Sequence, residues 1–285
     1  MAESWEEITG KRAALRIKND PAAQARLLER WRCLSEAWGL APVTVFEMGV
    51  HSSTQKVRTG NGQTAVLKLF ITPGVFAQQC RTLELSGCGP AILAADHRRE
   101  ALLLELIPGT PGVNGRHFDI ARARYELARW HAANGEGLPG LVEHHLEIAE
   151  GCLGFGLSDE ALGMADFFRR LDRGGKRGLV HGDLVPENIV CSERSCCFLD
   201  PRGYCGDQTF DWATLALYSA GSDLPGMLAR AERLSGVSIR RLAAWAWLRA
   251  VLSDAQERKV LGQDNGAETD TLRLARSAEP FFRRF

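Results

Sequence analysis

The chain has 285 residues, of which 45% are apolar and 25% are charged, and these are ordinary proportions for a globular protein. Its 35 basic and 35 acidic residues give a formal net charge of zero, so the composition argues against bulk affinity for nucleic acid or a membrane surface. No apolar run approaches the length of a membrane span. The acidic N-terminus lacks the basic and apolar regions of a signal peptide, so we expect a cytoplasmic protein.

The cysteines argue against a disulfide framework and against a zinc site. There are eight of them, without a C-x-x-C pair and without the ligand spacing of a zinc finger. Several lie in apolar runs. In a chain of this size with no export signal, they are predicted to be reduced and mostly buried thiols.

The N-terminal third predicts helices followed by a small sheet. Residues 1–19 are only loosely periodic and indicate a weak helix or a frayed end. Asp20 and Pro21 then form a good helix start, and apolar residues continue at helical spacing to Trp38, before Gly39 favours a left-handed stop. A further helix is expected over 74–85. Strands with short turns between them are predicted at 43–48, 55–59, 64–70, 91–95 and 101–106.

Two features of this region suit phosphate binding. Ser52, Ser53 and Thr54 end a small polar turn, where hydroxyl and backbone N–H groups can contact phosphate oxygens. Lys68 is flanked by apolar residues in the 64–70 strand, and a half-buried lysine is costly to desolvate unless it has a partner. Phosphate oxygens would be such a partner, although a lysine on the solvated face of an edge strand is the alternative.

The remainder of the chain is mainly helical by its periodicity. His131 falls within the first of these helices and is expected to be a core histidine with a satisfied hydrogen bond. Residues 135–156 are predicted to be rich in loops, and the basic run 169–177 to be a solvated turn. Further helices are predicted at 161–171, 210–220, 224–234 and 239–253.

The stretch 179–206 carries the chemistry. Two apolar residues end a buried strand, polar residues from His181 to Asn188 form a loop, and two short apolar runs around 192–195 predict a hairpin. With the turn centred near Arg194, Asn188 falls opposite Asp200, and opposed side chains lie about 5 Å apart at Cβ. An amide oxygen and a carboxylate together suit Mg²⁺, and Asp183 in the loop before them can act beside that metal.

These parts match phosphoryl transfer, which needs an aspartate to accept a hydroxyl proton and two oxygen ligands for the metal. The run from His181 to Asn188 resembles the catalytic loop of the aminoglycoside phosphotransferase and choline kinase superfamily. The run Leu199-Asp200-Pro201-Arg202-Gly203, with Gly206-Asp207 and the segment 210–213 after it, resembles the metal-binding segment of that superfamily.

The resemblance implies an α+β, protein-kinase-like fold with two lobes. A nucleotide-binding lobe would span 1–107, with leading helices in 1–40, and a helical lobe for catalysis and acceptor binding would span 108–285. Asp183 would be the catalytic base, Asn188 and Asp200 would bind Mg²⁺, and Lys68 would hold the phosphates of ATP or GTP. The segment 102–109 resembles the hinge between the lobes, where backbone groups of Glu105 and Ile107 would bind the adenine.

Two further residues carry roles that the resemblance implies. Asp211 would bond the backbone of the catalytic loop, and His181 would brace that loop rather than react. The sequence departs from the family in the 74–85 helix, because Gln78 or Cys80 stands where a glutamate usually pairs with the lysine. Either Glu84 serves in a shifted register, or Lys68 is held by phosphates and Gln78.

Within the superfamily, the chain looks most like the streptomycin 6-kinase branch. The expected activity is phosphorylation of a hydroxyl on a small, cationic aminoglycoside-type antibiotic, which confers resistance by inactivating the drug. The acidic segment 254–270 fits a cationic acceptor, and it equally fits a solvated surface. A kinase of another antibiotic or of a choline-like or fructosamine-like metabolite is the alternative, as is a nucleotide-binding pseudokinase. Both a monomer and a homodimer are compatible with the sequence.

Overall fold

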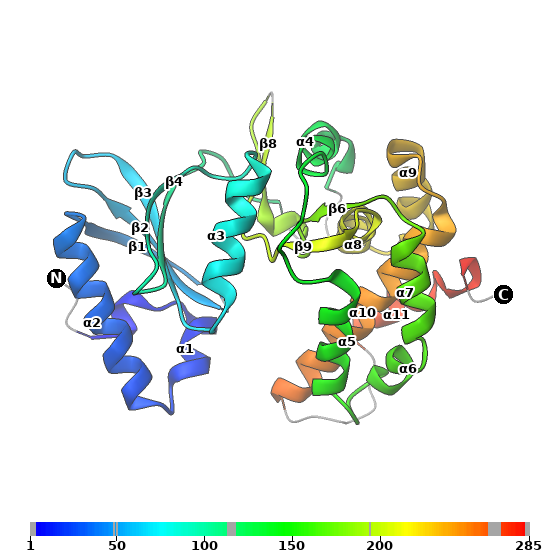
Figure 1. Cartoon of the computed structure of the whole chain (residues 1–285), viewed down its shortest axis with the longest axis horizontal. Helices are drawn as coiled ribbons and strands as arrows, with labels where there is room; N and C mark the ends of the chain where they lie inside the picture. Colours follow the sequence, from blue (N-terminus) through cyan, green and yellow to red (C-terminus); the bar gives the residue numbers. More distant parts are fainter. Residues whose placement is uncertain are drawn as a thin grey trace. The chain divides into compact units, whose positions relative to one another are not determined.

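A computed structural model describes residues 4–47, 49, 51–112, 118–193, 195–261 and 269–282. The chain divides into two compact units, Met1–Pro108 and Gly109–Phe285, and each is described here by itself (Figure 1). No helix in the described ranges is long and apolar enough to cross a membrane.

The first unit is built on an antiparallel five-stranded sheet in the order β1-β2-β3-β5-β4. Its strands are β1 (Ala41–Phe46), β2 (Ser52–Arg58), β3 (Thr64–Phe70), β4 (Ile92–Asp96) and β5 (Ala101–Glu105). The predicted strand 64–70 is confirmed as β3, the central strand of the sheet. Strand β2 begins three residues before the predicted position 55, so the hydroxyl residues 52–54 belong to the strand rather than to a turn.

Helices cover both faces of this sheet, because successive residues of a strand point to opposite faces. One face, with Leu67 and Leu69, packs against α1 (Lys11–Ile17) and α2 (Pro21–Ala37), and the other, with Phe70, packs against α3 (Val75–Ser86) (Figure 1). The predicted cap of α2 is confirmed, since Asp20 Oδ1 accepts a 2.9 Å hydrogen bond from the backbone N–H of Ala23.

Of the two alternatives for residues 1–19, a weak helix or a frayed end, the structure has the helix. A 3₁₀ turn (Glu6–Ile8) and α1 bring Ile8 and Ile17 into the core of the first unit, where they contact the sheet. The apolar residues of this segment are few and widely spaced, so burial against the sheet decides its conformation more than local periodicity does.

The second unit is mainly helical. Its helices are α4 (Arg124–Trp130), α5 (Leu141–Gly151), α6 (Ser158–Gly163), α7 (Ala165–Arg173), α8 (Thr209–Ser219), α9 (Leu224–Ser235), α10 (Ile239–Leu261) and α11 (Asp270–Arg276), with 3₁₀ turns at Ile120–Ala123, Pro186–Asn188 and Glu279–Phe281. Two short antiparallel sheets pair β6 (Arg177–Val180) with β9 (Tyr204–Asp207) and β7 (Ile189–Cys191) with β8 (Cys196–Phe198). Helices α8 and α10 pack against each other at the centre of this unit (Figure 1).

Two expectations for this unit are wrong. The segment predicted to be loop-rich contains α5, whose buried residues Val142, His145, Leu146 and Ala149 follow helical spacing. The helical period was not recognised in the sequence because one of these core positions is a histidine, His145. The basic run 169–177 is not a solvated turn, because Arg169 lies in α7 and Arg177 begins β6, and both form ion pairs with acidic side chains.

Candidate active site

The loop predicted to be catalytic lies between β6 and β7. A buried aspartate binds the backbone at the start of this loop. Asp211, at the start of α8, has no exposed surface. Its carboxylate accepts hydrogen bonds from the backbone N–H groups of His181 (2.8 Å) and Gly182 (2.9 Å). It also lies 2.9 Å from Nε2 of His131. The predicted structural roles of Asp211 and of His131 are therefore confirmed, and the loop begins from a fixed point.

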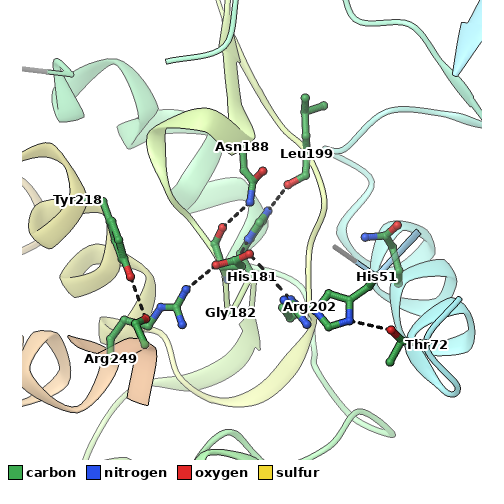
Figure 2. A network of polar contacts seen from close by, with 12 residues as sticks. His51, Thr72, His181, Gly182, Asn188, Leu199, Arg202, Tyr218 and Arg249 are labelled. Atoms are coloured by element: carbon green, nitrogen blue, oxygen red, sulfur yellow. Dashed lines mark hydrogen bonds and ion pairs between the residues drawn. The ribbon is translucent and has the colours of Figure 1, made fainter. Parts of the chain in front are cut away.

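His181 ties the loop to the segment that carries Asp200 (Figure 2). Its Nε2 lies 3.0 Å from the carbonyl oxygen of Leu199, and its Nδ1 lies 3.3 Å from the backbone N–H of Asp183. These partners assign a neutral imidazole that donates from Nε2 and accepts at Nδ1. Burial lowers the pKa of His181, which agrees with the neutral form. The ring therefore braces the loop, as the sequence predicts.

Gly182 is required by the shape of this loop. Its φ angle is +80°, a left-handed conformation that side chains disfavour. A Cβ atom at this position would collide with the ring of Tyr204 in β9. Burial raises the pKa of Tyr204 to about 12, so its phenol stays neutral near the loop. The close approach of ring and backbone thus depends on glycine.

Asp183 forms ion pairs with two arginines. Its Oδ1 accepts a 2.7 Å hydrogen bond from Nη2 of Arg249, in the middle of α10. Its Oδ2 lies 3.8 Å from Nε of Arg202, which follows Asp200 in the chain. The side chain of Asp183 is 21% exposed, unlike that of Asp211. A partly exposed carboxylate on a braced loop is suited to accept a proton from a ligand.

Asn188 completes the loop, but the predicted register is wrong by one position. Strand pairing sets Ile189 opposite Phe198, and the carbonyl oxygen of Asn188 accepts a 2.7 Å hydrogen bond from the N–H of Leu199. Asn188 therefore opposes Leu199 and not Asp200. The hairpin is centred between residues 193 and 194, whereas the prediction centred it on Arg194. Arg194 itself lies outside the described residues. Asp200 has left the ladder, with a φ of +55°.

The donor set of this region fits Mg²⁺. Nδ2 of Asn188 donates to the carbonyl oxygen of Asp183 at 2.9 Å, which leaves the amide oxygen as the ligand atom. The carboxylate of Asp200 would be the second ligand. No cluster of three or more histidine, cysteine or acidic side chains that could hold a metal occurs in the described part of the chain. Few protein ligands suit Mg²⁺, which usually keeps waters and phosphate oxygens in its other positions.

Lys68 in the first unit is buried and has a neutral partner. Its Nζ donates a 2.7 Å hydrogen bond to Oε1 of Gln79, in α3, and only 3% of the residue is exposed. The expectation that Gln78 or Glu84 pairs with it is wrong. Gln79 falls on the buried face of α3 with Phe76 and Leu83, whereas Glu84 is exposed and contacts Cys80 and Arg81.

The three hydroxyl residues of β2 divide between the two faces of the sheet. Ser53 is fully buried and donates to the carbonyl oxygen of Ile8, so its hydroxyl secures the N-terminal segment. Ser52 and Thr54 lie on the opposite face, with their hydroxyl oxygens 3.0 Å apart. Only these two of the three predicted residues present hydroxyls on the face that also carries Lys68, which pairs with Thr54 in the sheet.

The predicted hinge begins where β5 ends. The backbone N–H of Glu105 donates to the carbonyl oxygen of Ala91 at 2.9 Å, so Glu105 has only its carbonyl oxygen to offer a nucleotide base. Its side chain is exposed, and Ile107 is half-buried.

Comparison with known families identifies the chain. A family model described as aminoglycoside/hydroxyurea antibiotic resistance kinase matches residues 37–260. The chain belongs to this family of antibiotic resistance kinases. It is therefore a phosphotransferase that acts on an alcohol group, as the sequence predicts. A comparison with curated proteins found no match.

Solved structures confirm the predicted kinase-like fold. Choline kinase LicA from Streptococcus pneumoniae is 18% identical, with a TM-score of 0.65 over 90% of this chain and 99% of that one. LicA in complex with AMP is 17% identical, with a TM-score of 0.61 over 88% and 95%. Macrolide 2'-phosphotransferase MphH from Brachybacterium faecium is 16% identical, with a TM-score of 0.56 over 89% and 97%.

Sequence reasoning missed one residue of this antibiotic resistance kinase, Arg249. It stands alone in the apolar run of α10, between Leu248 and Ala250. A charge within such a run is costly to bury and so indicates a buried partner. That signal was present in the sequence, but it did not name Asp183, which is 66 residues away.

Two of the described acidic residues in the segment 254–270 form ion pairs with arginines, one buried and one exposed. Helix α10 continues beyond the predicted end at 253 to Leu261, and Asp254 is buried there with a 2.7 Å ion pair to Arg258. Asp270, in α11, pairs with Arg273 at 2.9 Å. Asp264 and Glu268 lie outside the described residues.

The prediction that all cysteines are reduced is also wrong. Cys191 and Cys196 are directly opposed in the β7–β8 hairpin, with Cα atoms 4.0 Å apart, and they form a disulfide. Of the cysteines described as free, Cys80 and Cys152 are buried, and the others are partly exposed.

Proposed function

We propose that this kinase transfers the γ-phosphoryl group of ATP to a hydroxyl of a streptomycin-like aminoglycoside and thereby inactivates the drug. The observation that supports it most is the set of bonds that joins three functional segments. His181 links the Asp183 loop to the Asp200 segment, and Asn188 donates to the carbonyl oxygen of Asp183. A base and two metal ligands are thus held in one network.

Each predicted residue has a role in this proposal except Ser53, whose hydroxyl secures the N-terminal segment. Lys68 binds phosphate oxygens, while Ser52, Thr54 and backbone groups of Glu105 and Ile107 bind the nucleotide. Asn188 and Asp200 hold Mg²⁺, which when bound neutralises charge on the phosphates. Asp183 orients the acceptor hydroxyl and takes its proton late, because transfer passes through a loose transition state in which positioning dominates. The binding of AMP by LicA, which shares the fold, supports an adenine nucleotide.

The family name supports two acceptor classes. An aminoglycoside agrees with the resemblance to the streptomycin branch, although Asp254 and Asp270 are already paired with arginines and are poor candidates for binding its cationic groups. A small neutral acceptor such as hydroxyurea is the second candidate, since Arg202 and Arg249 beside Asp183 disfavour a cation close to the reacting hydroxyl.

The test is ADP release from Mg-ATP by the purified chain in the presence of single compounds. The panel contains streptomycin, other aminoglycosides, hydroxyurea, choline and a fructosamine, and phosphorus NMR identifies the product. Strong stimulation of ADP release by streptomycin supports the proposal. Stimulation by another compound would keep the kinase mechanism and assign a different class of acceptor. If Mg-ATP raises the melting temperature while no compound stimulates release, the pseudokinase alternative gains over the proposal.

A further inference from the structure

Arg249 forms an unusual pair for a buried arginine. Its side chain is 17% exposed and lies in the apolar centre of α10, with the guanidinium carbon 5.6 Å from the ring centroid of Tyr218. The hydroxyl of Tyr218 in turn lies 2.9 Å from the hydroxyl of Ser253. Burial disfavours the charged form, but Tyr218 and Asp183 outweigh it and raise the pKa of Arg249. The guanidinium is therefore held rigidly on an aromatic surface with its Nη2 directed at Asp183.

The other buried arginine pairs of α10 differ in their partner. Arg241 binds Asp207, and Arg258 binds Asp254, both at 2.7 Å. These two aspartates have no exposed surface and secure the fold of this unit. Only in the pair formed by Arg249, among the described pairs of α10, is the aspartate partly exposed and part of the catalytic loop.

The two carboxylate oxygens of Asp183 have different contacts with the arginines. Arg249 uses Oδ1 of Asp183, whereas Oδ2 lies beyond hydrogen-bond range of Arg202, at 3.8 Å. The backbone of Asp183 is fixed separately by His181 and Asn188. The hydrogen bond from Arg249 to Oδ1 restricts the rotation of the carboxylate.

We infer that Arg249 is a positioning residue, which holds Asp183 by Oδ1 so that Oδ2 is directed at the acceptor hydroxyl. This inference rests on the proposed function. In the transfer step the acceptor oxygen forms a bond to the γ-phosphorus, and the bond from that phosphorus to the bridging oxygen breaks with its electron pair leaving on ADP. The acceptor O–H bond breaks, and its proton passes to Oδ2 of Asp183. Arg249 touches none of the reacting atoms and acts through Asp183 alone.

A double-mutant cycle tests this dependence. Arg249→Met keeps an unbranched apolar side chain, which is shorter than that of arginine, and removes the charge and the donors. It is expected to lower kcat about 100-fold, because small displacements of a reacting group cost about this much, while the KM for Mg-ATP stays unchanged. In an Asp183→Asn background the same change should have no further effect, since residues that act as one unit are not additive. Rates are measured with streptomycin, or with the panel compound that stimulates ADP release most.

Two variants separate positioning from folding. Arg249→Lys retains a cation and is expected to recover part of the lost kcat. Arg241→Met removes a comparably buried arginine from the same helix, and it should lower the melting temperature without lowering kcat in the folded protein. If Arg249→Met keeps normal kcat, or loses as much in the Asp183→Asn background as alone, the inference is overturned. If Asp183→Asn itself is fully active, the proposed function fails first.

Discussion

The two units of this kinase hold their functional charges in different ways. In the second unit, the Asp183 loop is fixed by its own protein partners, with Asp211 below it, His181 across it and Arg249 at its carboxylate. In the first unit, Lys68 donates to the neutral amide of Gln79. The hydrogen bond described for Lys68 is therefore to a neutral group, whereas Asp183 is bound by an arginine.

From this difference we expect the first unit to contribute mainly to ATP binding and the second mainly to the transfer step. A hydrogen bond to a charged group contributes about 1.5–3 kcal/mol, and a phosphate oxygen adds an attraction between opposite charges that the neutral amide of Gln79 lacks, so Lys68 gains more from phosphate than from Gln79. The Asp183 loop is held by hydrogen bonds within its own unit. Changes in the first unit should therefore appear mainly in the KM for ATP, and changes in the second mainly in kcat.

The largest expected effect is at the loop. Asp183→Ala should lower kcat about 10²–10⁴-fold, because general-base catalysis contributes about this factor. Asp200→Ala should abolish Mg-dependent turnover, since it removes the only carboxylate proposed as a metal ligand. Steady-state rates of ADP release with the best acceptor measure both.

Glu187→Gln is the control for these variants. It alters the other carboxylate of the loop, and it should leave kcat nearly unchanged. Normal turnover by Asp183→Ala would refute the proposed mechanism, and an equal loss in Glu187→Gln would show that the loss is not specific to Asp183.

A smaller effect concerns stability at low pH, which should depend on the second unit. Burial lowers the pKa of His145 to about 3, and the ring stays neutral with Nδ1 bound to the carbonyl oxygen of Leu141 at 2.7 Å. The unfolded chain binds a proton at this histidine below pH about 6.5, and the native state does not. Stability present above that pH is thus lost as the pH falls from about 6.5 to 3, by up to about 1.4 kcal/mol per pH unit.

His145→Gln tests this dependence because glutamine can donate to Leu141 but does not titrate. Its free energy of unfolding in urea should fall less steeply between pH 7 and pH 4 than that of the parent protein. His97→Gln removes an exposed histidine of the first unit and is the matched control. Parallel curves for the parent and His145→Gln would show that His145 is not the source of acid sensitivity.

Local sequence patterns predicted much of the fold and of the loop. Strand β3, the Asp20 cap and the hairpin follow from alternation, capping and turn residues, which act over a few positions. Asp183, Asn188 and Asp200 were chosen because their order and spacing match what phosphoryl transfer needs. The register of the hairpin was missed because several polar residues can form its turn. Moving the centre of the turn by half a residue changes the partner of every strand residue by one position.

The residues that sequence could not place are those chosen by tertiary contacts. Gln79, and not its neighbours, meets Lys68 because α3 turns that side chain towards the sheet. Arg249 meets Asp183 across 66 residues, and no local pattern pairs them. Helix α5 was missed because a buried histidine occupies a core position that is usually apolar.

The smallest expected effect concerns the first unit, at the residue Gln79 that binds Lys68. Gln79→Leu removes the hydrogen bond to Lys68 and should raise the KM for Mg-ATP about fivefold, the equivalent of about 1 kcal/mol for one such bond, with kcat unchanged. Gln78→Leu, one position away on a different face of α3, should change neither constant. A loss of kcat in Gln79→Leu would show that Lys68 contributes to the transfer step itself, and the separation of binding from chemistry between the two units would then not hold. An equal rise in KM for both variants would instead mean that α3 as a whole, and not the bond to Lys68, determines nucleotide binding.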